Sequence, residues 1–409
     1  MGARGSLPRI LFISEIIPRK PNSGGEMRCF HTARALRELG AVDVAILNMP
    51  GKTGDLEVAA EGEFPPAYVL DVEQRPNEGL LPKLRWTFNP GMDYPFGCGV
   101  EGEPVRLLRE SLGCYDLIWF FNLRSADIFP NAPWLRSVVD IDDLPSTGIS
   151  AALDAASGAG ERLQAWRRLF AWRRREHILG KRFTVLSVCS QDDKRRLESN
   201  GVGIPIYVIP NGFDAPSEEP VRAPATPPRI GFVGLYDYGP NRDGIDWFVR
   251  TCWPLIRQQI PGVRLRLAGK DTHGALNCND PQIDKLGWIE DADAEMASWS
   301  AMIVPIRGGG GTRIKIAHGF SRKCPVVSTT FGAYGYDVAD GRELYLADTP
   351  EAFAQACIRT IREPESAAQM AGRAWQRFLE NWTWDAIRPL VRATAEDCLR
   401  RSHASAHGA

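Results

Sequence analysis

The chain has 409 residues, of which 44% are hydrophobic and 24% are charged, a composition typical of globular proteins. At about 150 residues per domain, this length predicts two or three domains. The 49 Lys and Arg residues nearly cancel the 50 Asp and Glu residues, so no strong net charge favours nucleic acid as a partner. No stretch reaches the roughly 18 consecutive apolar residues of a membrane-spanning helix.

The cysteines and the first residues indicate the compartment. Nine cysteines are scattered without any C-x-x-C pair, and the six histidines show no metal-ligand spacing, so we expect a reducing compartment and no metal site. Residues 1–8 are polar and lack the apolar segment of a signal peptide, which predicts a cytoplasmic protein. They also match the short acylation pattern M-G-x-x-x-S at Gly2 and Ser6.

In the first half of the chain, predicted buried strands alternate with helices. A loop containing Gly24 and Gly25 leads into a helix predicted over 27–39, which stops at Gly40. A polar, proline-rich stretch at 211–228 shows neither helical nor strand periodicity and is predicted to be a linker. Short apolar runs typical of strands buried on both faces lie at 9–14, 42–47, 117–121, 137–141 and 184–188.

The alternation restarts after the predicted linker. Helices are expected at about 244–259 and from Thr312 onward, and strands at 229–234, 263–268, 302–305 and 325–329. Strands that alternate with helices imply parallel sheets with right-handed crossovers, so we predict an α/β protein with domains over 1–210 and 229–382. In such sheets, ligands bind beyond the carboxyl ends of the strands.

The segment 307–318 is the strongest candidate site in the sequence. Four glycines, 308–311, follow a strand and lead into a helix whose predicted N-cap is Thr312. Bare backbone N–H groups and a helix N-terminus favour an anion. Arg313 and Lys315 fall in the first helical turn, where cations are disfavoured unless a strong anion such as a diphosphate is bound. A flexible connector followed by an exposed basic turn is the alternative interpretation.

Two loops in the first half are weaker candidates. Gly24 and Gly25, with Arg28 one helical turn later, would admit a phosphate or a sugar close to the backbone, although any tight turn favours glycine. Asp142 and Asp143 follow a strand and are placed to bind hydroxyls or to act as a base. A helix cap or a turn explains either aspartate equally well.

A basic, aromatic helix is predicted between Glu161 and Arg182. Such a helix is typical of contact with an anionic membrane surface. The alternative is a solvated helix face whose tryptophans pack inward. The residues concerned are Trp166, Arg167, Arg168, Trp172, Arg173, Arg174, Arg175, Lys181 and Arg182.

In their order and spacing, these motifs resemble the GT-B glycosyltransferases, specifically the retaining group 1, family 4-like enzymes that use nucleotide sugars and build bacterial polysaccharides and glycolipids. The resemblance covers nearly the whole chain. It implies two Rossmann-like domains facing each other across a cleft, with residues 383–409 forming a helix that crosses back to the first domain and a polar tail. The segments that carry it include 10–28, 208–214, 231–248, 287–291, 310–318 and 324–329.

The resemblance implies a metal-independent transfer of sugar, with retention, from a UDP- or GDP-linked donor to a glycan or lipid-linked acceptor. Arg313 and Lys315 would stabilise the departing diphosphate, as preorganised charge does in such reactions, and Asp142 or Asp143 would orient the acceptor hydroxyl. Gly24, Gly25 and Arg28 would form an acceptor or phosphate loop. The implied donor-binding residues are Gly234, Asn241, Gly287, Trp288, Gly309, Gly310, Gly311, Thr312, Arg313, Lys315 and His318.

The sequence departs from the family at the Glu-x7-Glu pair, where Gly310 lies near the first position and His318 takes the second. Leu235 also stands where many relatives have an arginine. A histidine can hydrogen-bond a ribose hydroxyl, so we expect His318 to replace the second glutamate. Two alternatives remain: a catalytically lapsed GT-B subunit that binds a nucleotide sugar or a partner enzyme, and a nucleotide-sugar epimerase of the same fold.

Overall fold

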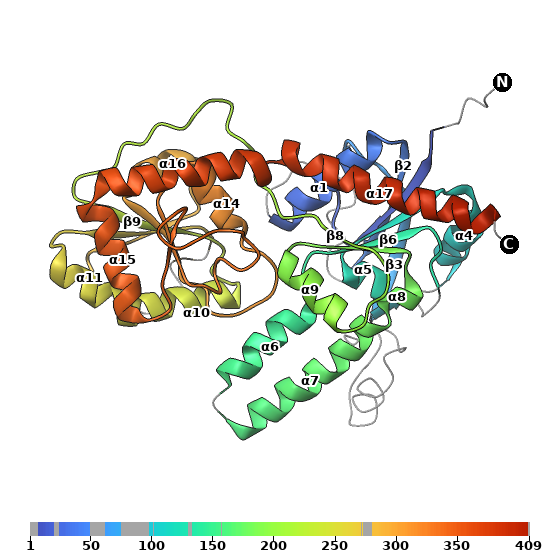
Figure 1. Ribbon diagram of the computed structural model, residues 1–409, viewed down its shortest axis with the longest axis horizontal. Helices are drawn as coiled ribbons and strands as arrows, with labels where there is room; N and C mark the ends of the chain where they lie inside the picture. The colour runs from blue at the N-terminus through green and yellow to red at the C-terminus, as the bar shows by residue number, and fades with distance from the viewer. Residues whose placement is uncertain are drawn as a thin grey trace. The chain divides into compact units, whose positions relative to one another are not determined.

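The computed structural model describes residues 7–19, 24–49, 62–74, 98–100, 102–129, 133–156, 158–270, 272 and 280–407, and the acylation pattern at Gly2 and Ser6 lies outside them. The chain forms two compact units, of which the first takes in the chain up to Pro210 and again from Ile387, and the second spans Asn211–Ala386. Each unit is a parallel sheet with helices (Figure 1), which confirms the predicted α/β class with two Rossmann-like units.

The first unit contains an eight-stranded sheet in the order β4-β3-β2-β1-β5-β6-β7-β8, parallel apart from the β3–β4 pair. The central strands are fully buried, because helices cover both faces of a parallel sheet, and these are the strands that the apolar runs predicted. The strand bounds are β1 Arg9–Ser14, β2 Ala41–Asn48, β3 Pro66–Gln74, β4 Cys98–Val100, β5 Leu117–Phe121, β6 Ser137–Ile141, β7 Val185–Val188 and β8 Ile206–Val208.

Two helices of the first unit, α6 and α7, lie side by side as a hairpin that extends away from the sheet (Figure 1). The last helix, α17 (Trp384–His407), starts in the second unit and packs with the first from Ile387 onward. The other helical bounds of this unit are α1 Gly24–Arg37, α4 Glu103–Ser111, η2 Leu112–Cys114, α5 Leu123–Asp127, α6 Pro145–Ala155, α7 Ala159–His177, α8 Leu179–Arg182 and α9 Gln191–Ser199.

The second unit is built on a six-stranded parallel sheet in the order β11-β10-β9-β12-β13-β14. The helix predicted at about 244–259 starts earlier, at Gly239, and contains a π-helical turn. The bounds are β9 Arg229–Val233, α10 Gly239–Trp247, η3 Phe248–Cys252, α11 Trp253–Gln259, β10 Arg264–Ala268, β11 Ile283–Gly287, α13 Ala292–Ala297, β12 Ala301–Val304, α14 Ile314–Ser321, β13 Val326–Ser328, β14 Tyr345–Leu346, α15 Pro350–Arg362 and α16 Pro364–Asn381.

The stretch 211–228, predicted as a linker, belongs to the second unit. The backbone N–H groups of Ala223 and Ala225 donate to the carbonyls of Ala297 and Ser298, at 3.0 and 2.9 Å. These bonds attach the stretch to the end of α13. A chain without helical or strand periodicity can therefore still be ordered, because its backbone groups find partners on a neighbouring element.

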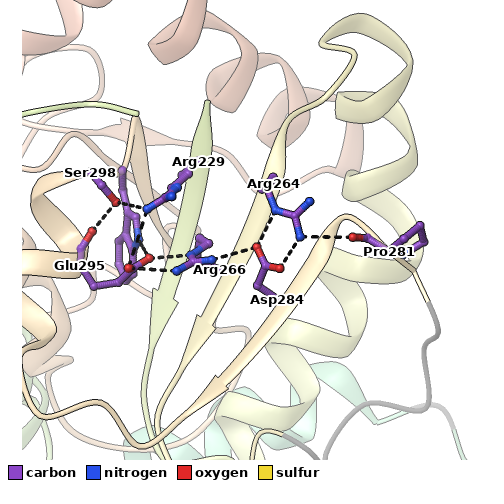
Figure 2. Close-up of polar contacts among 8 residues, drawn as sticks. Arg229, Arg264, Arg266, Pro281, Asp284, Glu295 and Ser298 are labelled. Carbon is purple, nitrogen blue, oxygen red and sulfur yellow. Dashed lines mark hydrogen bonds and ion pairs between the residues drawn. The ribbon is translucent and has the colours of Figure 1, made fainter. Parts of the chain in front are cut away.

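An ion network fixes α13 to the sheet of the second unit (Figure 2). Arg266 on β10 donates to Asp284 on β11 at 3.0 Å and to Glu295 on α13 at 2.6 and 3.0 Å. A hydrogen bond from Arg264 lowers the pKa of Asp284 below its usual range, while burial opposes the shift. Burial raises the pKa of Glu295, and the bond from Arg266 outweighs it, so the net pKa is lowered. Both carboxylates therefore stay ionised and hold α13 against the strands.

Candidate functional site

The glycine loop of the second unit connects the buried strand β12 to α14. Gly309 has φ 105° and Gly311 has φ 68°, values that favour glycine because other side chains are strained there. The helix begins at Ile314 with Arg313 in the N-cap position, so the prediction that Thr312 is the N-cap is wrong. The Thr312 hydroxyl instead accepts a hydrogen bond from the Asn211 amide at 2.9 Å. This bond ties the loop to the start of the second unit.

The side chain of Arg313 folds back on the glycine loop. Its Nη1 donates to the carbonyls of Gly310 and, at 2.6 Å, Gly311, and its Nη2 donates to the carbonyl of Gly308 at 3.3 Å. The guanidinium also lies 5.4 Å from the ring centroid of Phe331, and the residue is buried. Arg313 thus holds the shape of the loop, and its predicted contact with a diphosphate stays a prediction.

Lys315, on the first turn of α14, presents a largely desolvated cation. Its Nζ donates to Oδ1 of Asn241 at 2.7 Å and lies 4.1 Å from the ring centroid of Phe232. Among the residues that the structure describes, no carboxylate lies within ion-pair distance of this ammonium. Burial, with a smaller effect of the Arg313 charge, lowers the pKa of Lys315 to about 7. A bound anion would favour the charged form.

The loop after β9 packs directly on Lys315. A Cβ added to Gly234 would lie 2.9 Å from Nδ2 of Asn241 and 3.2 Å from Nζ of Lys315, so a larger residue would displace both. Asn241 Nδ2 donates to the carbonyl of Leu235 at 2.7 Å. This bond fixes the orientation of the amide whose oxygen accepts the hydrogen bond from Lys315. Gly234, Asn241 and Lys315, predicted separately from the sequence, are therefore brought together beyond the carboxyl end of β9.

Two further predicted residues follow the neighbouring strand β11. Gly287 has φ 69° and accepts a hydrogen bond from the N–H of Gly269 at 2.8 Å, which closes the ends of β10 and β11. The Trp288 side chain that follows is 68% exposed. An exposed indole is suited to stacking on a planar ring such as a nucleobase, and this role for Trp288 stays a prediction.

His318 on α14 has partners that the sequence did not indicate. Its Nε2 lies 3.1 Å from Oδ1 of Asp293 on α13, and its ring stacks on Phe213 with centroids 4.4 Å apart. Burial raises the pKa of Asp293, but hydrogen bonds from His318 and Arg322 outweigh this and keep the pKa well below its usual range. These contacts give the histidine a structural role beside the ribose contact predicted for it, which stays a prediction.

In the first unit, Gly24 and Gly25 begin α1, and residues 20–23 of the predicted loop lie outside the described residues. Arg28, predicted to bind an acceptor or a phosphate, instead makes contacts inside the first unit, and that binding role stays a prediction. The guanidinium is fully buried and pairs with Asp140 through both nitrogens, Nη2–Oδ1 at 2.6 Å and Nε–Oδ2 at 3.1 Å. It also donates to the carbonyl of Ile209 at 2.9 Å. Arg28 therefore joins α1 to the core of the sheet.

Asp142 and Asp143 lie between β6 and α6, where Asp143 is exposed and Asp142 is partly buried. The thiol of Cys189 lies 3.3 Å from Oδ1 of Asp142. The sequence did not identify Glu176 of α7, whose buried carboxylate accepts the N–H of Ser146 at 3.0 Å and so caps α6. The loop with both aspartates is thus held by the helix pair beside it, and their roles toward an acceptor stay predictions.

Within the described ranges, no group of three or more His, Cys, Asp or Glu side chains is arranged to hold a metal ion. No helix in the same part of the chain is long and apolar enough to cross a membrane.

The arginines of the predicted basic helix differ in their exposure. Arg175 and Arg182 are buried and pair with Asp127 at 2.8 and 2.6 Å, so these two arginines do not face solvent or a membrane. Its two tryptophans also differ in exposure, since Trp172 is buried and Trp166 is exposed.

Known structures share this architecture over nearly the whole chain. Sucrose-phosphate synthase from Thermosynechococcus elongatus superposes with a TM-score of 0.62 at 15% identity, over 96% of this chain and 100% of that one. HepE of Anabaena in complex with UDP-glucose superposes with a TM-score of 0.60 at 15% identity, over 95% and 100%. At these identities the likeness establishes the fold, and the two parallel-sheet units are those of a GT-B protein.

Sequence comparison gives the family that part of the second unit matches. Residues 227–363 match the family of glycosyl transferases group 1, and this segment contains the glycine loop, Asn241 and Lys315. A 44.6 kDa protein of the cps region of Klebsiella pneumoniae is 23% identical over 170 residues, which is 38% of this chain and 42% of that relative's length. Residues 227–363 therefore match the group 1 glycosyltransferases, and the chain has the GT-B fold.

Proposed function

We propose that this chain is a retaining, metal-independent glycosyltransferase that moves a sugar from a nucleoside-diphosphate sugar to a glycan or lipid-linked acceptor. The observation that carries the proposal is the ammonium of Lys315, which is desolvated, lacks an ion-pair carboxylate among the described residues and stands beside four consecutive glycines. A diphosphate supplies the opposite charge that this position needs, and the glycine loop leaves backbone N–H groups accessible to it.

In this proposal, the second unit binds the donor. Lys315, beside the loop that Arg313 shapes, stabilises negative charge as the diphosphate departs, and this preorganised charge needs no reorganisation during the reaction. Trp288 stacks on the base and His318 contacts the ribose, with Asp293 and Phe213 holding its ring. HepE, crystallised with UDP-glucose, supports a UDP-linked donor for this chain, and a GDP-linked donor is the second choice.

The acceptor side of the proposal rests on the first unit. Asp142 or Asp143 orients the acceptor hydroxyl, since both follow β6 at the carboxyl edge of the sheet where ligands of α/β proteins bind. The relative in a cps region supports a role in polysaccharide synthesis. We place the reaction in the cytoplasm or at the inner face of its membrane, where nucleotide sugars are available to the enzyme.

The test is release of free nucleoside diphosphate from UDP-glucose, UDP-N-acetylglucosamine and GDP-mannose, each with and without a panel of alkyl glycosides as acceptors, in the presence of EDTA. Release that depends on acceptor and survives EDTA supports a metal-independent transferase. Binding by calorimetry without any release identifies a lapsed subunit. Conversion of the donor sugar without acceptor identifies an epimerase.

A further inference from the structure

A pocket with a volume of about 570 Å³ lies between the helices of the α6–α7 hairpin, in the first unit. This size is typical of small-molecule sites. Its wall is largely hydrocarbon and is formed by Ser150, Leu153, Trp166, Leu169, Phe170 and Ile178. Arg173, Arg174, His177 and Asn200 form the remainder. The pocket therefore combines an apolar interior with a basic side.

The apolar surface continues from this pocket onto the outer face of α7. Leu163 is 67% exposed and Trp166 is 56% exposed. Leu163, Trp166 and Phe170 are spaced as neighbours on one face of a helix. The rings of Trp166 and Phe170 stack with their centroids 5.8 Å apart, so the two form one apolar plane. Exposed apolar patches next to a pocket mark a place where a ligand or a partner is bound.

The charge on α7 indicates an anionic ligand. Arg162, Arg168 and Arg173 are exposed and Arg167 is partly exposed. Among the residues that the structure describes, no carboxylate lies within ion-pair distance of these four guanidinium groups. Arg175, on the same helix, differs from these four arginines because it is buried and forms an ion pair with Asp127. The helix thus carries a set of arginines that stabilise the fold and a separate set that faces solvent.

We propose that the α6–α7 pocket binds a lipid phosphate. Its hydrocarbon chain lies between α6 and α7, and its phosphate lies among the arginines at the carboxyl-terminal end of α7, nearest Arg173 and Arg174. Arginine suits this head group because its planar guanidinium binds phosphate oxygens with two parallel hydrogen bonds. The guanidinium of Arg174 lies 5.5 Å from the Phe170 ring centroid, so the charged and apolar parts of the site adjoin.

The site is close in the chain to the proposed acceptor loop. α6 begins at Pro145, two residues after Asp143, and its eleven residues span about 16 Å at 1.5 Å per residue. A lipid chain along Ser150 and Leu153 would therefore lie on the helix that follows this loop. The lipid site is inferred from α6 and α7 themselves, and its existence does not depend on the transferase activity.

The probe is dodecyl phosphate, titrated below its critical micelle concentration into the whole protein by calorimetry, with inorganic phosphate and the neutral dodecyl maltoside in parallel. We expect saturable binding of one dodecyl phosphate, and at least tenfold weaker binding of the other two. Trp166→Ala removes apolar contact and should weaken binding roughly tenfold. Arg173→Glu should weaken it at least roughly fivefold. Ser150→Trp fills the pocket and should abolish it.

Two exposed residues elsewhere in the first unit serve as matched controls. Leu135→Ala is the control for Trp166→Ala, and Arg106→Glu is the control for Arg173→Glu. Both controls should bind dodecyl phosphate as the wild type does. UDP binding by each variant shows that the second unit is folded, and circular dichroism reports on the rest. Lys315→Met should bind dodecyl phosphate normally while it loses UDP, which separates this site from the donor site.

Three results overturn the proposal. The first is adsorption to phosphatidylglycerol vesicles without saturable binding of monomeric dodecyl phosphate, because α7 would then lie on a bilayer with no chain in the pocket. The second is binding of dodecyl phosphate that Ser150→Trp and Trp166→Ala leave unchanged. A pocket that instead binds an acidic amphipathic peptide at least tenfold more tightly than dodecyl phosphate also contradicts a lipid ligand.

Discussion

The ammonium of Lys315 on α14 donates to the amide oxygen of Asn241 on α10 at 2.7 Å, across 74 positions of the sequence. An amide oxygen and the face of Phe232 offset part of the desolvation of this cation, and the remainder appears as a pKa lowered to about 7. The second unit thus holds a poorly compensated positive charge beside a glycine loop. Such an arrangement costs stability and is typical of a site built for an anion.

The first prediction concerns this cation. Lys315→Met should weaken UDP binding by roughly ten- to a hundredfold, because a charge-assisted hydrogen bond contributes about 1.5–3 kcal/mol. Lys323→Met is the matched control, since Lys323 also lies in the second unit but pairs with Glu219. Calorimetry measures both affinities. Equal loss in the two variants would mean that the general charge of the unit, rather than Lys315, attracts the nucleotide.

The second prediction is a pH dependence of donor binding. The free protein has a Lys315 pKa of about 7, and a bound diphosphate raises it, so binding takes up a proton above pH 7. The affinity for UDP-glucose should therefore fall between pH 7 and 9, by up to roughly tenfold per unit. Titrations in two buffers of different ionisation enthalpy count the protons taken up. Lys315→Met should show no such slope, and a slope that persists in this variant would assign it to another group.

The third prediction uses the close approach at Gly234. Gly234→Ala places a Cβ 2.9 Å from Asn241 Nδ2 and 3.2 Å from Lys315 Nζ, so both side chains must shift and UDP affinity should fall at least roughly tenfold. Gly239→Ala, at the start of α10, is the control, because an added Cβ there meets nothing within 4 Å. Calorimetry with UDP distinguishes the two variants, and wild-type affinity in Gly234→Ala would contradict the packing described.

The fourth prediction tests the structural role of Arg28. Arg28→Met leaves the carboxylate of Asp140 buried without its cation and should lower the free energy of unfolding by about 3–5 kcal/mol. Arg9→Met, the comparison, removes the exposed ion pair with Asp43 and should lower the free energy of unfolding by about 1 kcal/mol or less. Urea unfolding measures both. UDP affinity of Arg28→Met, measured where the protein is folded, should match the wild type, because the proposed donor-binding residues all belong to the second unit.

The fifth prediction concerns Glu176, whose pKa burial raises to about 7. The raised pKa means that the folded state binds more protons than the unfolded state between about pH 4.5 and 7, so stability falls as pH rises through this window. Between pH 5.5 and 8, the free energy of unfolding of the wild type should fall by roughly 2 kcal/mol more than that of Glu176→Gln. Thermal unfolding at the two pH values measures the difference. An identical pH dependence in both proteins would show that Glu176 keeps an ordinary pKa.

The strands that the sequence predicted well are those that helices bury on both faces. The runs at 117–121 and 137–141 match β5 and β6 residue for residue, because a continuous apolar run has few alternatives to a buried strand. The strand β3, next to the edge strand β4, mixes apolar and polar residues, the edge strand β8 has only three residues, and neither was predicted. The linker expected at 211–228 is ordered on α13, since its backbone finds partners that composition does not reveal.

The sequence by itself determined the α/β class, the position of the glycine loop and the presence of Lys315 on the helix that follows it, because each depends on residues close together in the chain. The tertiary structure decided what each charge does. Arg28 and Lys315 both follow glycine-containing loops, yet Arg28 pairs with Asp140 inside the sheet, whereas Lys315 meets an amide and an aromatic ring. The partner of a buried charge comes from a distant strand or helix, and this partner determines whether the charge stabilises the fold or remains available to a ligand.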